Sequence, residues 1–274
     1  MFSTMEKENK LVNKLKRLIR RLGLPRWLHQ YGPKKFMFRQ LCLGLLLKEV
    51  FRLSYRRAMN FLSEFYNLNL HWTTLQKFRK RIPLDIWRRL LNATNNGNIE
   101  IAAIDGTSLQ RTNPSQHYLK RIDRTHKISV PIYLNAMVDV LNRKFVSVRH
   151  HSNKTGEQKD VKYLVEHSEK EIDLILMDKL YDSEKLHRYF RERGTYSIIP
   201  VKKNWAKGQI RKQLKDGFDY VQYWQRNLVE SLFSALKRLF GNNLKSLNAK
   251  TQRAEIYMRL IAYNLGAIWS EIFY

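Results

Sequence analysis

The chain has almost no cysteine: Cys42 is the single one among 274 residues. One cysteine excludes an intrachain disulfide and any zinc site built from several thiolates. Leucines flank Cys42 in the sequence, so we expect a buried, unreactive thiol.

Long apolar runs are also absent. The longest, around residues 41–47, is far shorter than the roughly 18 residues of a membrane-spanning helix. The first ten residues are charged and lack the apolar segment of a secretory signal. We therefore expect no membrane partner and a cytoplasmic, nucleoid-associated location.

Acidic residues are scarce relative to basic ones. The sequence has 51 lysines and arginines against 24 aspartates and glutamates, a formal net charge of +27 and an isoelectric point near 10.2. Such an excess of one sign opposes folding by self-repulsion and usually serves a polyanionic partner. Nucleic acid is the leading candidate.

Residues 1–97 are the more basic part, with 21 lysines and arginines against five acids, an excess of 16 positive charges. Apolar residues recur there at helical spacing, which predicts an all-α region. Ser54 can cap a helix over residues 55–65, and a turn at 66–69 precedes a second helix over 75–82, which Pro83 ends.

This helix pair resembles a helix-turn-helix, because its second member carries Lys77, Arg79, Lys80 and Arg81. An ordinary helical bundle with solvated basic faces remains an alternative. The charge of the region favours DNA.

A turn-rich linker at residues 93–98 separates this region from a different pattern. Strands are predicted at residues 99–104, 127–141, 144–150, 172–177 and 196–201, and helices at 156–170, 183–193, 222–240 and 249–272. Three hairpin-ordered strands, then alternating helices and strands, are typical of a ribonuclease H-like α/β domain. We therefore expect a helical domain at 1–97 and a catalytic domain at 98–274 with a five-stranded mixed sheet flanked by helices.

Two carboxylates follow predicted buried strands. Asp105 comes directly after the strand at 99–104, and Asp178 after the strand at 172–177. Such positions place side chains at a sheet edge, and Gly106 allows a ligand to approach the backbone. Each aspartate alone could equally be a turn or capping residue.

The helix predicted at 222–240 has one apolar face and one polar face. At about 100° per residue, Tyr223, Arg226, Glu230 and Lys237 fall on the polar side. A plain i,i+4 ion pair between Arg226 and Glu230 is the simpler interpretation of two of them.

The spacing Tyr223-x₂-Arg226-x₃-Glu230-x₆-Lys237 resembles the Y-(2)-R-(3)-E-(6)-K motif of DDE transposases from prokaryotic insertion sequences. Residues 104–107 and 178–183 are similar to the family's segments around its first and second aspartates. The resemblance covers roughly residues 99–274. Leu180 stands where the family usually has glycine, which leaves open a catalytically inactive or repurposed DNA-binding relative.

The resemblance implies a transposase that binds insertion-sequence ends and catalyses metal-dependent DNA cleavage and strand transfer. Asp105, Asp178 and Glu230 would be its catalytic, metal-binding carboxylates. The cofactor would be Mg²⁺, with Mn²⁺ as a substitute and two ions at the site. A different ribonuclease H-like nuclease, such as a resolvase, fits the four-residue motif less well.

Double-stranded DNA is the implied partner, both as terminal inverted repeats and as target, with a homodimer in the DNA complex. Basic and aromatic residues are the candidate contacts. They are Tyr223, Arg226, Lys237, Lys127, Trp205, Lys202, Lys203, Lys77, Arg79 and Lys80.

Overall fold

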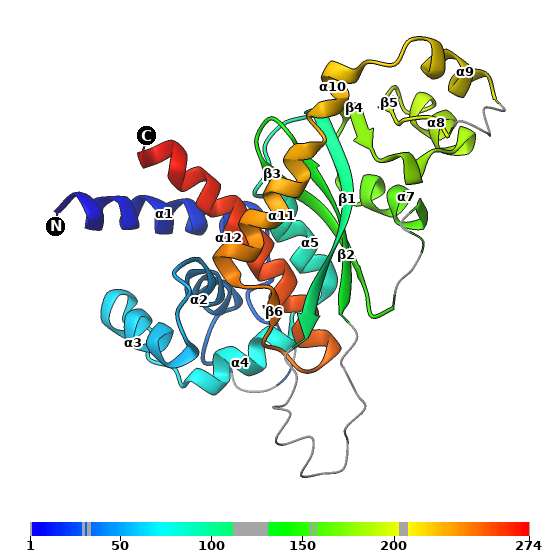
Figure 1. Cartoon of the computed structure of the whole chain (residues 1–274). Helices are drawn as coiled ribbons and strands as arrows, with labels where there is room; N and C mark the ends of the chain where they lie inside the picture. The colour runs from blue at the N-terminus through cyan, green and yellow to red at the C-terminus, as the bar shows by residue number, and fades with distance from the viewer. Residues whose placement is uncertain are drawn as a thin grey trace, which may run out of the picture. The chain divides into compact units, whose positions relative to one another are not determined.

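A computed structural model describes residues 2–28, 31, 34–111, 131–153, 156, 158–202 and 208–273 (Figure 1). The chain divides into two compact units. The helical unit comprises Met1–Asn95 with Asn248–Tyr274, and the α/β unit comprises Asn96–Leu247. Within the part of the chain that the structure describes, no helix combines the length and apolarity that crossing a membrane requires.

The helical unit is built around α2. Its helices are α1 (Phe2–Arg21), α2 (Phe38–Val50), α3 (Tyr55–Tyr66), α4 (Trp72–Arg81), α5 (Leu84–Asn92) and α12 (Ala249–Phe273). Helix α2 packs against α1, α3, α4 and α12. Its Cys42 is fully buried, as expected, and this burial raises the pKa of the thiol to about 12.

Helices α3 and α4 form the predicted helix pair. Ser54 Oγ accepts a hydrogen bond from the backbone N–H of Arg57, so it caps α3 as the sequence predicts. Asn67 ends α3 in a left-handed conformation, which turns the chain toward α4. Pro83 then precedes α5 rather than only ending α4.

Helix α12 belongs to the helical unit, whereas the sequence analysis grouped it with the catalytic domain. It packs against α2, α4 and α5, and Asn264 Nδ2 donates a 2.7 Å hydrogen bond to Thr94 Oγ1 just after α5. The apolar periodicity of a helix shows that it is buried but does not show its partner.

The α/β unit contains a six-stranded mixed sheet. The strands β1 (Ile99–Arg111), β2 (Ile132–Asp139), β3 (Lys144–His151), β4 (Ile172–Met177) and β5 (Tyr196–Ile198) lie in the order β3-β2-β1-β4-β5. The prediction of five strands missed β6 (Asn243–Leu244), which pairs with the end of β1 and is too short for any periodicity. Strand β1 pairs antiparallel with β2 and parallel with β4.

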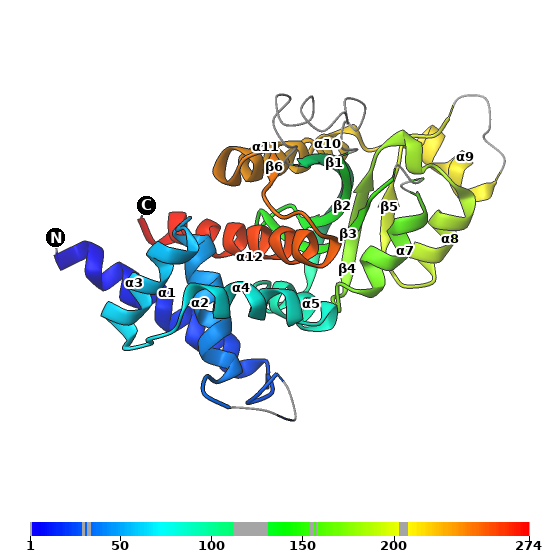
Figure 2. The ribbon, with the colours of Figure 1, turned by 90° about the horizontal axis from the view of Figure 1, so that it is seen from below.

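Helices cover both faces of this sheet. The alternation of side chains along a strand sends Val146 of β3 to one face, into a core with α7 (Gln158–Glu166) and α8 (Glu184–Arg191). Its neighbour Phe145 faces the other way and lies 5.7 Å from Phe233 of α11 (Asn227–Phe240), between ring centroids. Figure 2 shows α11 on one side of the sheet and α7 and α8 on the other.

The sequence predicted one continuous helix over residues 222–240. That prediction was wrong, because the structure has two helices there. Helix α10 (Tyr220–Trp224) ends before Gln225, and α11 begins at Asn227. Between them the backbone bonds tighten to an i→i+3 pattern, as in Arg226 N–H to Tyr223 O and Val229 N–H to Arg226 O. Tyr223 therefore lies on a separate short helix, while Arg226 stands at the N-terminus of α11.

Candidate active site

Asp105 and Asp178 follow the last paired residues of two adjacent parallel strands. The parallel pairing of β1 and β4 ends with Ile104 opposite Met177, and an aspartate comes next on each strand. Strand β4 stops there, but β1 continues to Arg111, so the prediction that Asp105 ends its strand was wrong. Each aspartate accepts a hydrogen bond from the following backbone N–H, at 2.8 Å from Gly106 and 2.7 Å from Lys179.

Arg226 connects the first of these aspartates to α11. Its Nη1 lies 3.1 Å from Asp105 Oδ2, and its Nη2 lies 3.0 Å from Glu230 Oε1. The expected i,i+4 pair is therefore present, but the same guanidinium also reaches across to β1. Two of the three candidate metal ligands consequently lie within hydrogen-bonding reach of one planar group.

Two further candidate site residues, Asp178 and Tyr223, act on the charge of Arg226. Burial opposes its charge, but the neighbouring carboxylates and the Tyr223 phenol outweigh this, so the pKa of Arg226 rises. Asp178 is among those carboxylates. Burial also raises the pKa of Tyr223, whose ring lies 5.9 Å from the guanidinium.

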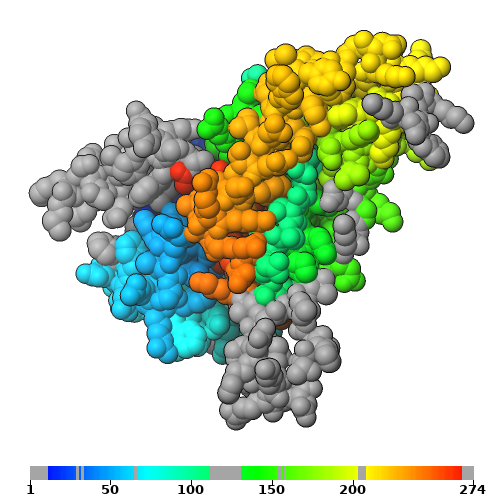
Figure 3. Space-filling view, viewed as in Figure 1, coloured from blue at the N-terminus to red at the C-terminus, as the bar shows by residue number. Residues whose placement is uncertain are grey.

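Lys237, two turns beyond Glu230 on α11, contacts the same face of β1. Its Nζ donates a 2.8 Å hydrogen bond to Thr107 Oγ1, and desolvation lowers the pKa of the ammonium group. Asp105 and Thr107 are two residues apart on a strand and so point to the same side, toward α11. Sequence reasoning missed Thr107, although its i+2 spacing from Asp105 was a signal. Figure 3 shows the surfaces of β1 and α11 lying side by side.

The chemistry of these side chains can be compared with what a divalent cation requires. Within the described ranges, no three carboxylate, imidazole or thiol side chains form a group ready to bind a metal. The oxygens of Asp105 and Glu230 nevertheless surround a positive group, the guanidinium of Arg226. Hard carboxylate oxygens are also the donors that Mg²⁺ prefers, so the residues fit such an ion.

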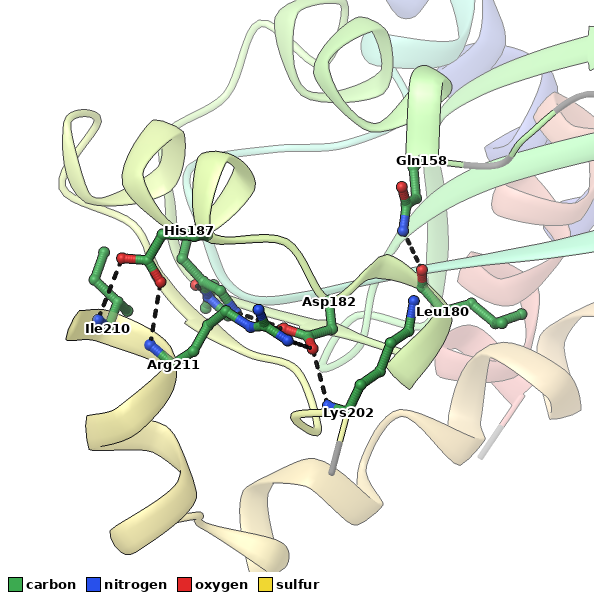
Figure 4. Close-up of polar contacts among 9 residues, drawn as sticks. Gln158, Leu180, Asp182, His187, Lys202, Ile210 and Arg211 are labelled. Atoms are coloured by element: carbon green, nitrogen blue, oxygen red, sulfur yellow. Dashed lines mark hydrogen bonds and ion pairs between the residues drawn. The ribbon is translucent and has the colours of Figure 1, made fainter. Parts of the chain in front are cut away.

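A second polar cluster is centred on Asp182, which follows Asp178 by four residues in the sequence (Figure 4). The buried carboxylate of Asp182 accepts hydrogen bonds from Arg211 Nε at 2.8 Å and Nη2 at 2.6 Å, and from the backbone N–H of Lys202 at 2.9 Å. His187 is also fully buried, with Nε2 3.8 Å from Asp182 and Nδ1 2.7 Å from Ser197 Oγ. Desolvation lowers the pKa of this histidine.

This cluster changes the view of the basic stretch after β5. Arg211 of this stretch is buried against Asp182 and is not part of the exposed basic surface. Lys202 is half-buried. Lys127, Lys203 and Trp205, which the sequence analysis also selected, lie outside the described residues.

The candidate DNA contacts on α4 do not share one environment. Lys77 and Lys80 are exposed. Arg79 is half-buried, and its guanidinium lies 5.6 Å from the ring centroid of Tyr55. Burial raises the pKa of Tyr55 to about 12, and Arg79 partly counteracts that rise. Arg79 thus stabilises the helical unit from within, whereas the two lysines are accessible.

The fold and the site define a mixed α/β protein that carries carboxylates on adjacent strands and on a facing helix, within a strongly basic chain. The chain belongs to the transposase DDE domain family, whose model matches residues 96–265, more than half of the sequence. That range includes Asp105, Asp178 and Glu230.

Among solved structures, the chain is similar to one described as the cryo-EM structure of a piggyBac transposase synaptic complex with hairpin DNA. The identity is 13%, the match covers 96% of this chain and 72% of that chain, and the TM-score is 0.48. A comparison with curated proteins found no match.

Proposed function

We propose that this chain is an active, metal-dependent transposase of a prokaryotic insertion sequence, with a ribonuclease H-like catalytic domain. It would bind the terminal inverted repeats of its element, cleave there and join the ends to target DNA, as a homodimer on the DNA. The observation that carries this proposal is the shared guanidinium of Arg226, which draws Asp105 of β1 and Glu230 of α11 together beside the strand that leads to Asp178.

Asp105, Asp178 and Glu230 would hold Mg²⁺, with Mn²⁺ as a substitute. Two such ions supply activation of the attacking oxygen and stabilisation of the leaving oxygen during displacement at phosphorus. Lys237, held by Thr107, would neutralise a phosphate oxygen beside these carboxylates. Arg226 would hold a phosphate beside the metals as well, and Tyr223 would contact a phosphate or a displaced base.

The departure at Leu180 has a structural explanation compatible with activity. Leu180 lies in a single 3₁₀ turn, η1 (Lys179–Tyr181), and its φ angle is not positive, so the turn does not require glycine. Its side chain is exposed, and its carbonyl accepts a hydrogen bond from Gln158 Nε2 (Figure 4). A leucine therefore fits there without backbone strain.

The test uses labelled duplexes taken from the DNA that flanks the coding sequence, incubated with the full chain and Mg²⁺. We expect cleavage at one defined phosphodiester, lost in Asp105→Asn, Asp178→Asn and Glu230→Gln while DNA affinity persists, because phosphate contacts by lysine and arginine dominate affinity. Asp173→Asn, which neutralises an exposed acid on β4, is the matched control and should cleave normally. Specific binding without cleavage by the unmodified chain would favour the alternative, a repurposed DNA-binding relative.

A further inference from the structure

The contacts of Arg226 use the oxygens that a cation would need. Asp105 Oδ1 accepts from the Gly106 N–H at 2.8 Å, and Asp105 Oδ2 accepts from Arg226 at 3.1 Å. Glu230 Oε1 accepts from the other end of the same guanidinium at 3.0 Å. A divalent ion that bound Asp105 and Glu230 through these oxygens would have to take them from Arg226.

The guanidinium is held there by a contact with β1 as well as by the i,i+4 ion pair within α11. Its partner Asp105 is 121 residues away in the chain, so the contact depends on the docking of α11 against β1. The Arg226 side chain is only 14% exposed, compared with 61% for Glu230. An arginine side chain keeps its proton in proteins, so it cannot release the carboxylates by becoming neutral. It can only be displaced.

We propose that Arg226 is an internal competitor of the catalytic cation: it occupies the position between Asp105 and Glu230 and must move before a divalent metal binds there. This inference rests on the proposed function, because it takes both carboxylates as metal ligands. A DNA phosphate offers the displaced guanidinium an equivalent pair of oxygen acceptors. The same arginine can therefore hold the site in the free chain and contact DNA afterwards.

The experiment measures Mn²⁺ binding without DNA, from the loss of the electron paramagnetic resonance signal of free Mn²⁺. The full chain is compared with Arg226→Gln, which removes the bridging charge and keeps a polar side chain. Arg238→Gln is the matched control, because Arg238 is an exposed arginine of the same helix and its loss changes the net charge equally. We expect Arg226→Gln to bind Mn²⁺ at least about fivefold more tightly than Arg238→Gln, the lower end of typical coupling between two binding events.

Equal or weaker Mn²⁺ binding by Arg226→Gln would overturn the inference, because it would mean that Arg226 does not compete or even supports the site. Arg226→Lys provides a second reading if the glutamine variant folds poorly. Lysine keeps the charge but lacks the two-ended fork of arginine. The Mn²⁺ affinity of Arg226→Lys should therefore lie between those of Arg226→Gln and Arg238→Gln.

Asp105→Asn separates this inference from the proposed function. If Asp105→Asn abolishes Mn²⁺ binding while Arg226→Gln leaves it unchanged, the metal site stands and only the competition is refuted. If Mn²⁺ binding does not depend on Asp105, the site assignment fails and the inference fails with it.

Discussion

Lys237 of α11 and Thr107 of β1 are joined by a 2.8 Å hydrogen bond although 130 residues separate them. The bond fixes a half-buried ammonium group on the side of β1 that carries Asp105. Because desolvation already lowers the pKa of Lys237, the hydroxyl is an acceptor that supports its charged form.

Thr107→Val should therefore lower the pKa of Lys237 further and destabilise the α/β unit by about 1 kcal/mol, the usual contribution of one hydrogen bond. The pKa can be followed by NMR of the lysine side-chain carbons, and the stability by urea denaturation. Ser108→Ala removes a hydroxyl from the opposite face of β1 and should leave the Lys237 titration unchanged. An unchanged titration in Thr107→Val would show that the hydroxyl does not support the ammonium.

Asp182→Ala should be among the most destabilising single changes in the α/β unit. It leaves the buried Arg211 without its carboxylate, and breaking a buried ion pair from one side costs about 3–5 kcal/mol. Replacing both partners, as in Asp182→Leu with Arg211→Met, should recover most of the loss. Urea denaturation of both variants and of the exposed control Asp173→Asn checks this, and a loss under 1 kcal/mol in Asp182→Ala would contradict the assigned role.

His187 should make the α/β unit less stable in acid. Burial lowers its pKa below the ordinary value of 6.5, so below that pH the unfolded chain takes up a proton that the folded chain does not. Because the unfolded state then binds more protons, the free energy of unfolding falls as the pH falls from 6.5 toward the lowered pKa of the folded state.

Denaturation midpoints at pH 8 and pH 5.5 should therefore differ less in His187→Gln than in the unmodified chain. His167→Gln, which removes a half-buried histidine of the same unit, is the matched control. An identical pH dependence in all three proteins would remove His187 from the explanation.

The residues of α4 should separate into two classes. Lys77→Gln with Lys80→Gln should weaken DNA binding and reduce the slope of log affinity against log salt by about 2, without changing the melting temperature. Arg79→Gln should instead lower the melting temperature, because Arg79 packs over Tyr55. Fluorescence anisotropy across a salt series and thermal melting measure both effects. A melting temperature of Arg79→Gln equal to that of the double lysine variant would refute the distinction.

Only those features of the site that follow from local strand and helix periodicity could be predicted from the sequence. Alternation and strand length located Asp105 and Asp178 after buried stretches, and β4 has the predicted bounds of 172–177. Helical spacing placed Arg226 and Glu230 on one face. It could not show that Arg226 also reaches Asp105, because that contact depends on how α11 docks against β1.

Other differences have the same origin. Asp182 is buried, and a sequence pattern cannot pair it with Arg211, 29 residues further on. The sequence predicted a helix over residues 249–272 but did not indicate that it packs against α2, α4 and α5. The break between α10 and α11 left no signal, because it consists of a few tightened hydrogen bonds and not of a proline or glycine.

The central claim, that Asp105 holds the metal that supports DNA cleavage, is tested most directly by Asp105→Cys. A thiolate is a poor ligand for Mg²⁺ but a good one for softer divalent ions. Cys42 is buried and unreactive, so the introduced thiol would be the accessible one. Using a duplex that the unmodified chain cleaves, we predict no cleavage by Asp105→Cys with Mg²⁺ and recovered cleavage with Mn²⁺ or Cd²⁺, at the same phosphodiester. Cleavage by Asp105→Cys with Mg²⁺ at the unmodified rate would contradict the claim.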